Sequence, residues 1–199
     1  MSAILALCLL AAPMTFSVRG GVARLGGEKD RNREAAMFGV SALWRSGSLL
    51  LGGSFDSSSR IGTLYVGDVR HLFFTAMGGG SFPMTDRLSL ELLGEAGAHR
   101  VSGTRFGPRL VAASLDPNAG LINVYNGTEA AWAPFAGLRP SLELIAAPLA
   151  VGVAIWTRFD LLQLAPDIYL DPALFPNAPG SPLNRLSFGA DLHLAFHFD

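Results

Sequence analysis

The sequence predicts an all-β fold, a single antiparallel up-and-down transmembrane β-barrel of about eight strands. Of its 199 residues, 50% are hydrophobic and only 16% are charged, whereas an ordinary soluble domain has about 25% charged residues. The 23 glycines and 12 prolines divide the apolar residues into short segments. In several segments apolar residues alternate with polar ones, which is the period of a strand with one apolar face. An apolar solvent around the barrel explains the shortage of charge, because residues that face lipid need none.

The first residues carry no charge, and the apolar run from Ile4 to Ala12 has the character of a secretory signal. No lysine or arginine precedes this run, however, and Pro13 follows Ala12 where cleavage would be convenient. We therefore expect residues 1–13 to be a signal-peptide remnant or an extra strand, and residues 14–199 to form the barrel domain. The single cysteine, Cys8, lies in the first segment, so no disulfide forms within the chain.

Seven alternating segments and one segment placed only by its position account for the expected strands. The alternating segments are 15–22, 36–45, 48–55, 88–99, 132–144, 149–158 and 185–198. Residues 64–77 occupy the place of a further strand, although neither of its faces is purely apolar. Tight turns are expected at 46–47 and 146–148, and a longer glycine-rich turn at 78–83.

The C-terminal segment shows the clearest alternation. Seven apolar residues occupy one face without interruption: Leu186, Phe188, Ala190, Leu192, Leu194, Phe196 and Phe198. A long final strand with terminal aromatic residues resembles the assembly signal of bacterial outer-membrane β-barrels, and the chain is similar to the small barrels of the OmpA-like size class. The resemblance assigns this signal to Leu192, Leu194, Phe196 and Phe198. Asp199 departs from the pattern, because such barrels usually end on the aromatic residue itself.

The resemblance implies a location in the bacterial outer membrane, with outer-membrane lipid and the barrel-assembly machinery as partners, and a monomeric state. If the chain enters from the periplasmic side, the connections 26–32, 56–60, 103–128 and 163–184 face outward. Long outer connections and short inner turns are the expected asymmetry. The two longest connections contain apolar residues such as Tyr125 and Phe175. We expect contacts with a ligand or a surface there, unless these residues only pack the loops together.

The polar faces of the strands carry charges whose signs alternate around the closed sheet. The predicted interior charge network comprises Arg19, Glu91, Glu95, Arg139, Glu143, Arg158 and Asp191. Closure of the barrel is expected to bring Asp191 beside Arg19. Side chains fill a barrel of eight strands, and buried charges require partners, so the sequence predicts a polar, plugged interior and no pore. A relay or ion pathway through the same charges is the functional alternative.

The sequence contains no strong motif for nucleic-acid binding, metal binding or catalysis. The net charge of -1 leaves no basic surface for nucleic acid. His193 and His197 have the spacing of a zinc-binding helix, but on a strand they lie about 13 Å apart at ~3.3 Å per residue. Ser54 follows two glycines without the second glycine of a nucleophile elbow. We therefore expect no enzyme activity, no metal site and no cofactor.

The predicted function is that of a non-enzymatic outer-membrane barrel that supports the envelope or binds a ligand, a surface or lipopolysaccharide through its outer loops. One alternative is a membrane-embedded, lipid-modifying hydrolase, which requires His71 or His99 near a loop serine such as Ser102. The other is a soluble, lipocalin-like barrel that binds a small apolar ligand. The soluble barrel requires the inverse arrangement, with apolar residues inside and polar residues outside.

Overall fold

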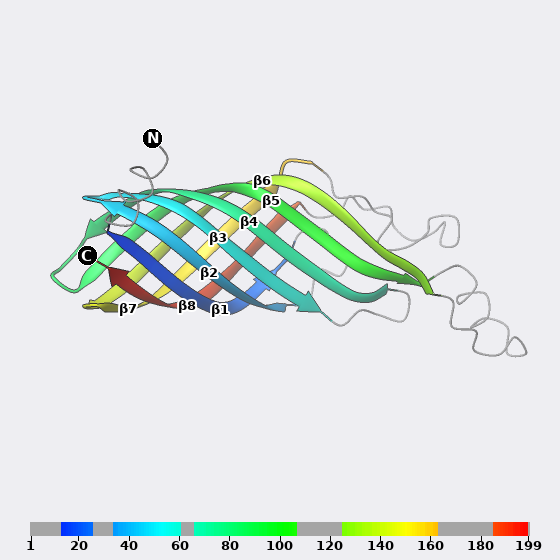
Figure 1. Ribbon diagram of the computed structural model, residues 1–199, viewed down its shortest axis with the longest axis horizontal. Coiled ribbons are helices and arrows are strands. Elements are labelled where there is room, and N and C mark those ends of the chain that lie inside the picture. The colour runs from blue at the N-terminus through cyan, green and yellow to red at the C-terminus, as the bar shows by residue number, and fades with distance from the viewer. Residues whose placement is uncertain (1–12, 26–33, 61–65, 107–124, 163–184, 199) are drawn as a thin grey trace, which may run out of the picture.

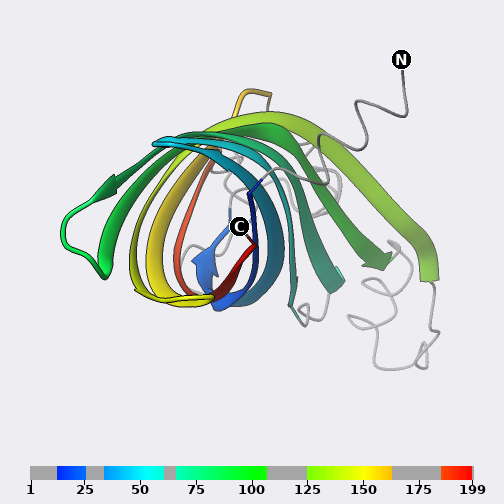
Figure 2. The same ribbon diagram turned by 60° about the vertical axis from the view of Figure 1, so that its left-hand side comes forward.

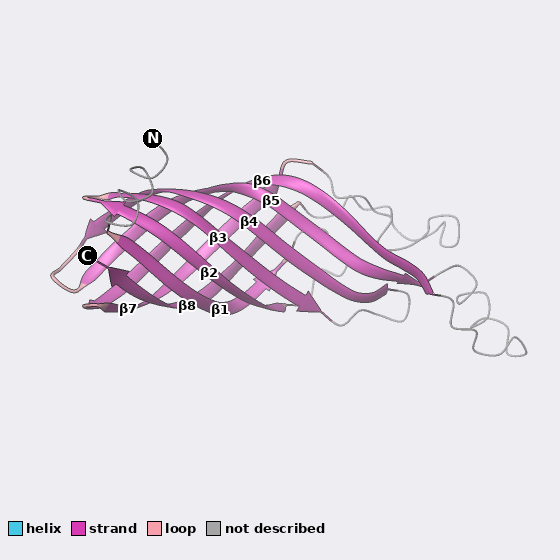
Figure 3. Cartoon of the chain, in the orientation of Figure 1, coloured by secondary structure: helices cyan, strands magenta, loops and turns pink. Residues whose placement is uncertain are grey.

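The computed structural model describes residues 13–25, 34–60, 66–106, 125–162 and 185–198, and these residues form one closed barrel (Figures 1 and 3). The barrel consists of eight strands: β1 (Met14–Arg24), β2 (Ala35–Ser46), β3 (Leu49–Arg60), β4 (Val66–Pro83), β5 (Leu88–Phe106), β6 (Tyr125–Ala146), β7 (Leu149–Asp160) and β8 (Leu186–Phe198). The predicted all-β, antiparallel barrel of eight strands is confirmed. No helix that is long and apolar enough to cross a membrane occurs among the described residues.

Each strand pairs with its neighbours in sequence, and β1 closes the barrel against β8 (Figure 2). This last pairing is antiparallel and extends from Met14 opposite Phe198 to Arg24 opposite Phe188. Short turns at 47–48, 84–87 and 147–148 join strands at one end of the barrel, which we call the turn end. The opposite end is the loop end. Gly47 has a φ of 58°, a left-handed conformation that glycine adopts without strain in the tight β2–β3 turn.

Two segments that were predicted as connections are strand instead. Residues 56–60 continue β3, because the Asp56 side chain is buried and paired inside the barrel. Residues 78–83 continue β4, and the turn follows at 84–87, where the Thr85 hydroxyl accepts hydrogen bonds from the amides of Arg87 and Leu88. Position 79 of this strand requires glycine, because a Cβ there would collide with the Leu92 carbonyl of β5. Strands β5 and β6 also extend further into the predicted 103–128 connection, to Phe106 and from Tyr125.

The two faces of the sheet have opposite chemistry. On β8, Phe188, Leu192 and Phe196 face outward and are 39%, 63% and 38% exposed. Asp191 of β8 and Arg158 of β7 face inward and are 5% and 1% exposed. Strand β7 alternates between exposed and buried side chains over its whole length. The apolar residues thus lie outside and the charges inside, the inverse of the arrangement that a soluble barrel requires.

The interior also contains two apolar clusters that the sequence did not predict. One lies toward the turn end and consists of Leu43, Leu50, Met77 and Leu93. The other lies toward the loop end and consists of Ala23, Leu25, Ala35, Met37, Phe73, Phe135 and Trp156. The inward Phe73 explains why residues 64–77 showed no clean alternation: this strand presents aromatic residues to both faces. The charged residues occupy the space between and around these clusters.

Candidate functional site: the buried charge network

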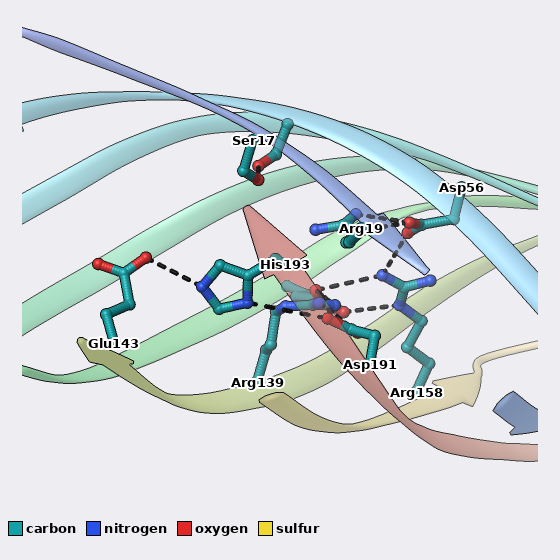
Figure 4. Close-up of polar contacts among 10 residues, drawn as sticks. Ser17, Arg19, Asp56, Arg139, Glu143, Arg158, Asp191 and His193 are labelled. Carbon is teal, nitrogen blue, oxygen red and sulfur yellow. Dashed lines mark hydrogen bonds and ion pairs between the residues drawn. The ribbon is translucent and has the colours of Figure 1, made fainter. Parts of the chain in front are cut away.

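Arg158 of β7 is the centre of the buried charge network (Figure 4). Its Nε lies 2.6 Å from Oε2 of Glu95 on β5, and its Nη2 lies 2.8 Å from Oδ2 of Asp56 on β3. All three side chains have no solvent exposure. Because these ion pairs cross the barrel between strands that are not neighbours, Arg158 ties three parts of the wall together.

Aromatic rings surround the same guanidinium group. The Arg158 Cζ lies 4.7 Å from the ring centroid of Phe73, 5.3 Å from that of Phe135 and 4.8 Å from that of Trp156. At these distances the negative faces of the rings attract a cation. The loop-end apolar cluster therefore both fills the barrel and stabilises the positive charge beneath it.

Three further residues complete a layer of charges around Arg158, Glu95 and Asp56, which we call the Arg158 layer: Arg19, Arg139 and Asp191. Arg19 and Asp191 have other partners in it than expected. Arg19 pairs with Asp56 through an Nη2–Oδ1 distance of 2.6 Å. Asp191 pairs with Arg139 of β6, which also lies 3.7 Å from Glu95. The expected approach of Asp191 to Arg19 is thus replaced by two separate pairs, and Asp56 is a network residue that the sequence reading missed.

A glycine gave a usable signal for the missed Asp56. Gly39 faces inward on β2, and a Cβ at this position would collide with the carboxylate of Asp56 and the guanidinium of Arg19. The Arg19–Asp56 pair therefore occupies the space that Gly39 leaves. Glycine inside a strand often marks the close approach of another group, and Gly39 is such a position.

A second group of charges lies toward the turn end. The Nη2 of Arg45 is 2.8 Å from Oε1 of Glu91 and 3.9 Å from Oε2 of Glu143. The Nε2 of His193 lies 3.0 Å from the other oxygen of Glu143. Arg45 and His193 were not among the predicted network residues, although both have the inward parity of their strands. All seven predicted residues are buried, and each has at least one of these charged partners.

A small polar cavity separates this turn-end group from the Arg158 layer. Its volume is about 20 Å³, and Arg19, Arg139, Glu143 and His193 are among the residues that line it. A cavity of this size holds about one water molecule. No group of three or more potential metal ligands occurs in the described part of the chain. The arrangement can hold opposite charges in fixed positions, and it offers no space for a substrate between them.

A chain of two histidines and a carboxylate lies inside the loop end. The Nδ1 of His71 is 3.0 Å from the Nε2 of His99, and the Nδ1 of His99 is 3.0 Å from Oδ2 of Asp160. The His99 ring also stacks on Phe73, with centroids 4.1 Å apart. Ser102 belongs to the opposite, outward parity of β5. The structure therefore brings the two histidines together without the serine that the hydrolase alternative requires.

The fit of Trp156 against β8 yields a stability prediction. A Cβ on Gly189 would lie 2.5 Å from the Val22 carbonyl of β1 and 2.6 Å from the indole of Trp156, so Gly189→Leu displaces the ring and strains the β1–β8 pairing. We expect a loss of about 1–3 kcal/mol, the usual effect of overpacking a filled interior, measured as a shift of the unfolding midpoint in guanidinium chloride.

The matched control for Gly189→Leu is Ala190→Leu, one residue further along β8. Ala190 faces outward, where it lines a hollow of about 580 Å³ in the apolar wall. The added side chain enters open space there, and we expect stability to stay within about 0.5 kcal/mol of the original. Equal losses from the two substitutions would contradict the assignment of the faces.

Comparison with known proteins gives relatives in structure and none in sequence. No protein-family profile matches the chain, and no curated protein matches it. The crystal structure of Neisserial surface protein A superposes with a TM-score of 0.61 at 8% identity, covering 94% of this chain and 96% of that one. Ail, the attachment invasion locus protein of Yersinia pestis, superposes with a TM-score of 0.53 at 14% identity, covering 94% and 99%.

The chain has the fold of the small eight-stranded outer-membrane β-barrels. The predicted resemblance to this class is therefore confirmed. Ail in complex with the heparin analogue sucrose octasulfate has the same fold, with a TM-score of 0.52 at 11% identity over 94% of this chain and 99% of that one. At such identities the likeness is one of fold, and it does not extend to the ion pairs around Arg158.

Proposed function

We propose that this protein is a non-enzymatic, monomeric outer-membrane barrel with a closed interior, which acts as a scaffold for the segments that join its strands at the loop end. One observation carries the proposal: apolar side chains cover the outward face, while the charged inward side chains are buried in ion pairs. This arrangement suits a barrel surrounded by hydrocarbon. It is unfavourable in water, where an apolar surface of this extent leads to association.

A closed interior follows from what occupies it. The Arg158 layer spans the barrel from β3 to β7, and an apolar cluster lies on each side of it. Water and ions would have to displace side chains that are paired or packed. The proposed role is therefore structural or adhesive: the barrel supports the envelope, or its loop-end segments bind a ligand or a surface.

The topology suggests an orientation and an assembly route. The turn end would face the periplasm and the loop end the exterior, which is the usual asymmetry of such barrels. Leu192, Leu194 and Phe196 are exposed on the outward face of β8. Together with Phe198 they would present an apolar, aromatic edge to the barrel-assembly machinery before β8 pairs with β1.

Electrical recording tests the closed interior. The purified protein, reconstituted into planar lipid bilayers, is expected to show no stable single-channel conductance, because the Arg158 layer obstructs the barrel. Heat-modifiable migration on a denaturing gel checks that the same preparation contains the folded barrel. A large and steady conductance from folded protein would refute the closed interior and would favour an ion pathway through the charges.

A lipid hydrolysis assay tests the non-enzymatic part of the proposal. We expect no release of fatty acid from vesicles that contain the inserted protein, because Ser102 and the His71–His99 pair have opposite parities. The matched variant is His99→Asn, which removes the imidazole and with it the Nε2 atom that contacts His71. Fatty-acid release that disappears in His99→Asn would instead support the hydrolase alternative.

A further inference from the structure

Three strands place an arginine at the first outward position beyond their apolar span on the loop-end side. On β4 the outward residues from 72 to 82 are uncharged, and Arg70 follows; on β5 the outward residues from 88 to 98 are uncharged, and Arg100 follows. On β1, Arg24 follows Val22. Spans of about ten residues suffice for a tilted strand to cross the hydrocarbon of a bilayer. These arginines therefore lie where the hydrocarbon would end.

Arg70 and Arg100 lie close enough to share one ligand. The register pairs Leu72 with Arg100 and Arg70 with Ser102, so the two arginines are diagonal neighbours on adjacent strands. Such neighbours have Cα atoms about 7–8 Å apart, within reach of long side chains. Ser102, which is opposite Arg70 in the register, is buried at 8% exposure, so the two arginines alone present polar groups at this point of the wall.

Aromatic side chains mark the same level of the wall. Trp132 of β6 is opposite Arg100 in the register and is 56% exposed. The Arg100 guanidinium lies 5.8 Å from the Trp132 ring centroid, and Phe74 stacks on Trp132 with centroids 5.9 Å apart. Tryptophan at the edge of an apolar band is typical of the membrane–water interface.

The part of this wall whose side chains the structure describes carries no negative charge around the two guanidinium groups. Among the described outward side chains of β3 to β6 there is no aspartate or glutamate. Arg24, by contrast, lies 3.7 Å from Glu34. At the edge of hydrocarbon, two neighbouring arginines are stabilised by an anion, and a guanidinium fork fits phosphate oxygens in particular.

We propose that Arg70 and Arg100 form a site for the phosphate headgroup of a lipid in the leaflet at the loop end, with Trp132 against its upper acyl chains. The site rests on the proposed membrane function. It would fix the barrel's depth in the bilayer by binding a lipid. Each arginine contributes about five-fold to the preference for an anionic lipid, the usual effect of a basic residue at a membrane surface.

Quenching of Trp132 fluorescence tests this site. The protein has three tryptophans, and Trp156 faces the interior. The substitution Trp44→Phe therefore leaves Trp132 as the tryptophan that faces outward. The protein is inserted into phosphatidylcholine vesicles that contain either brominated phosphatidic acid, which carries a phosphomonoester, or brominated phosphatidylcholine. We expect phosphatidic acid to quench Trp132 at severalfold lower mole fraction. Arg70→Gln, which leaves the Arg100–Trp132 contact in place, should reduce this preference, and Arg70→Gln with Arg100→Gln should abolish it.

Arg87→Gln is the matched control, because Arg87 is an exposed arginine at the turn end, and the preference should persist in it. Equal quenching by the two lipids, or a preference that survives the double substitution, would overturn the lipid site. Loss of the preference on addition of inorganic phosphate would show a site for free phosphate and would overturn the lipid assignment. Quenching by neither lipid would show that the protein is not inserted, which contradicts the proposed function itself.

Discussion

Arg158→Met is expected to destabilise the barrel by about 3–5 kcal/mol, the usual effect of removing one member of a buried ion pair. The substitution keeps the apolar length of the side chain but removes the charge that Glu95 and Asp56 share. Among the described residues, Asp56 retains Arg19 at 2.6 Å, whereas Glu95 retains Arg139 at the longer distance of 3.7 Å. Most of the loss should therefore come from Glu95. The measurement is the free energy of unfolding in guanidinium chloride for protein inserted into lipid vesicles.

The pairing of charges gives this prediction a specific control. Glu95→Gln in the Arg158→Met background removes the uncompensated carboxylate, so the double variant should be more stable than Arg158→Met alone. Arg87→Met alters an exposed arginine in the β4–β5 turn and should change stability by less than about 0.5 kcal/mol. If Arg158→Met behaved like Arg87→Met, the Arg158 layer would not be holding the barrel together.

Leu192→Arg is expected to destabilise the inserted barrel by about 2–4 kcal/mol, because it places a cation on the middle of the lipid-facing wall. Leu192 is 63% exposed on β8, so the longer side chain meets no steric obstacle. In water the same substitution would be almost neutral, since arginine at an exposed strand position is well solvated. The change in the free energy of unfolding in vesicles therefore shows whether lipid or water surrounds this face of the barrel.

Met84→Arg is the control for Leu192→Arg. Met84 is an apolar residue of similar exposure, 59%, but it lies in the turn after β4. At this position the arginine reaches headgroups or water, and we expect a change of about 0–1 kcal/mol. Similar small effects of both substitutions would indicate that water surrounds the β8 face, and they would revive the soluble-barrel alternative.

The wall of the barrel could be predicted from the sequence where each strand face has one chemistry. Strand β8 carries apolar residues at every outward position from Leu186 to Phe198, so period and polarity agree. Strand β4 could not be predicted in the same way, because Phe73 faces inward and Phe74 faces outward. An aromatic residue indicates lipid in a simple reading, but Phe73 is needed inside to cover the Arg158 guanidinium.

The pairing inside the barrel could be predicted only in part. The inward parity identified the charged residues, since burial of charge is unfavourable on a lipid face. Their partners were assigned from neighbouring strands, whereas Arg158 of β7 reaches Glu95 on β5 and Asp56 on β3. Asp56 itself begins a run of aspartate and serines that reads as a turn. Contacts across a closed cylinder depend on its diameter and tilt, which local sequence does not determine.

The pairing of β1 with β8 determines the order in which the molecule can be completed. These strands are the first and last of the barrel, yet Met14 lies opposite Phe198 and Arg24 opposite Phe188. Until β8 is in place, β1 and β7 both expose unsatisfied backbone hydrogen-bonding groups, which hydrocarbon cannot satisfy. A chain that lacks its final strand therefore has two open sheet edges, and the wall is sealed only when the two ends of the sequence meet.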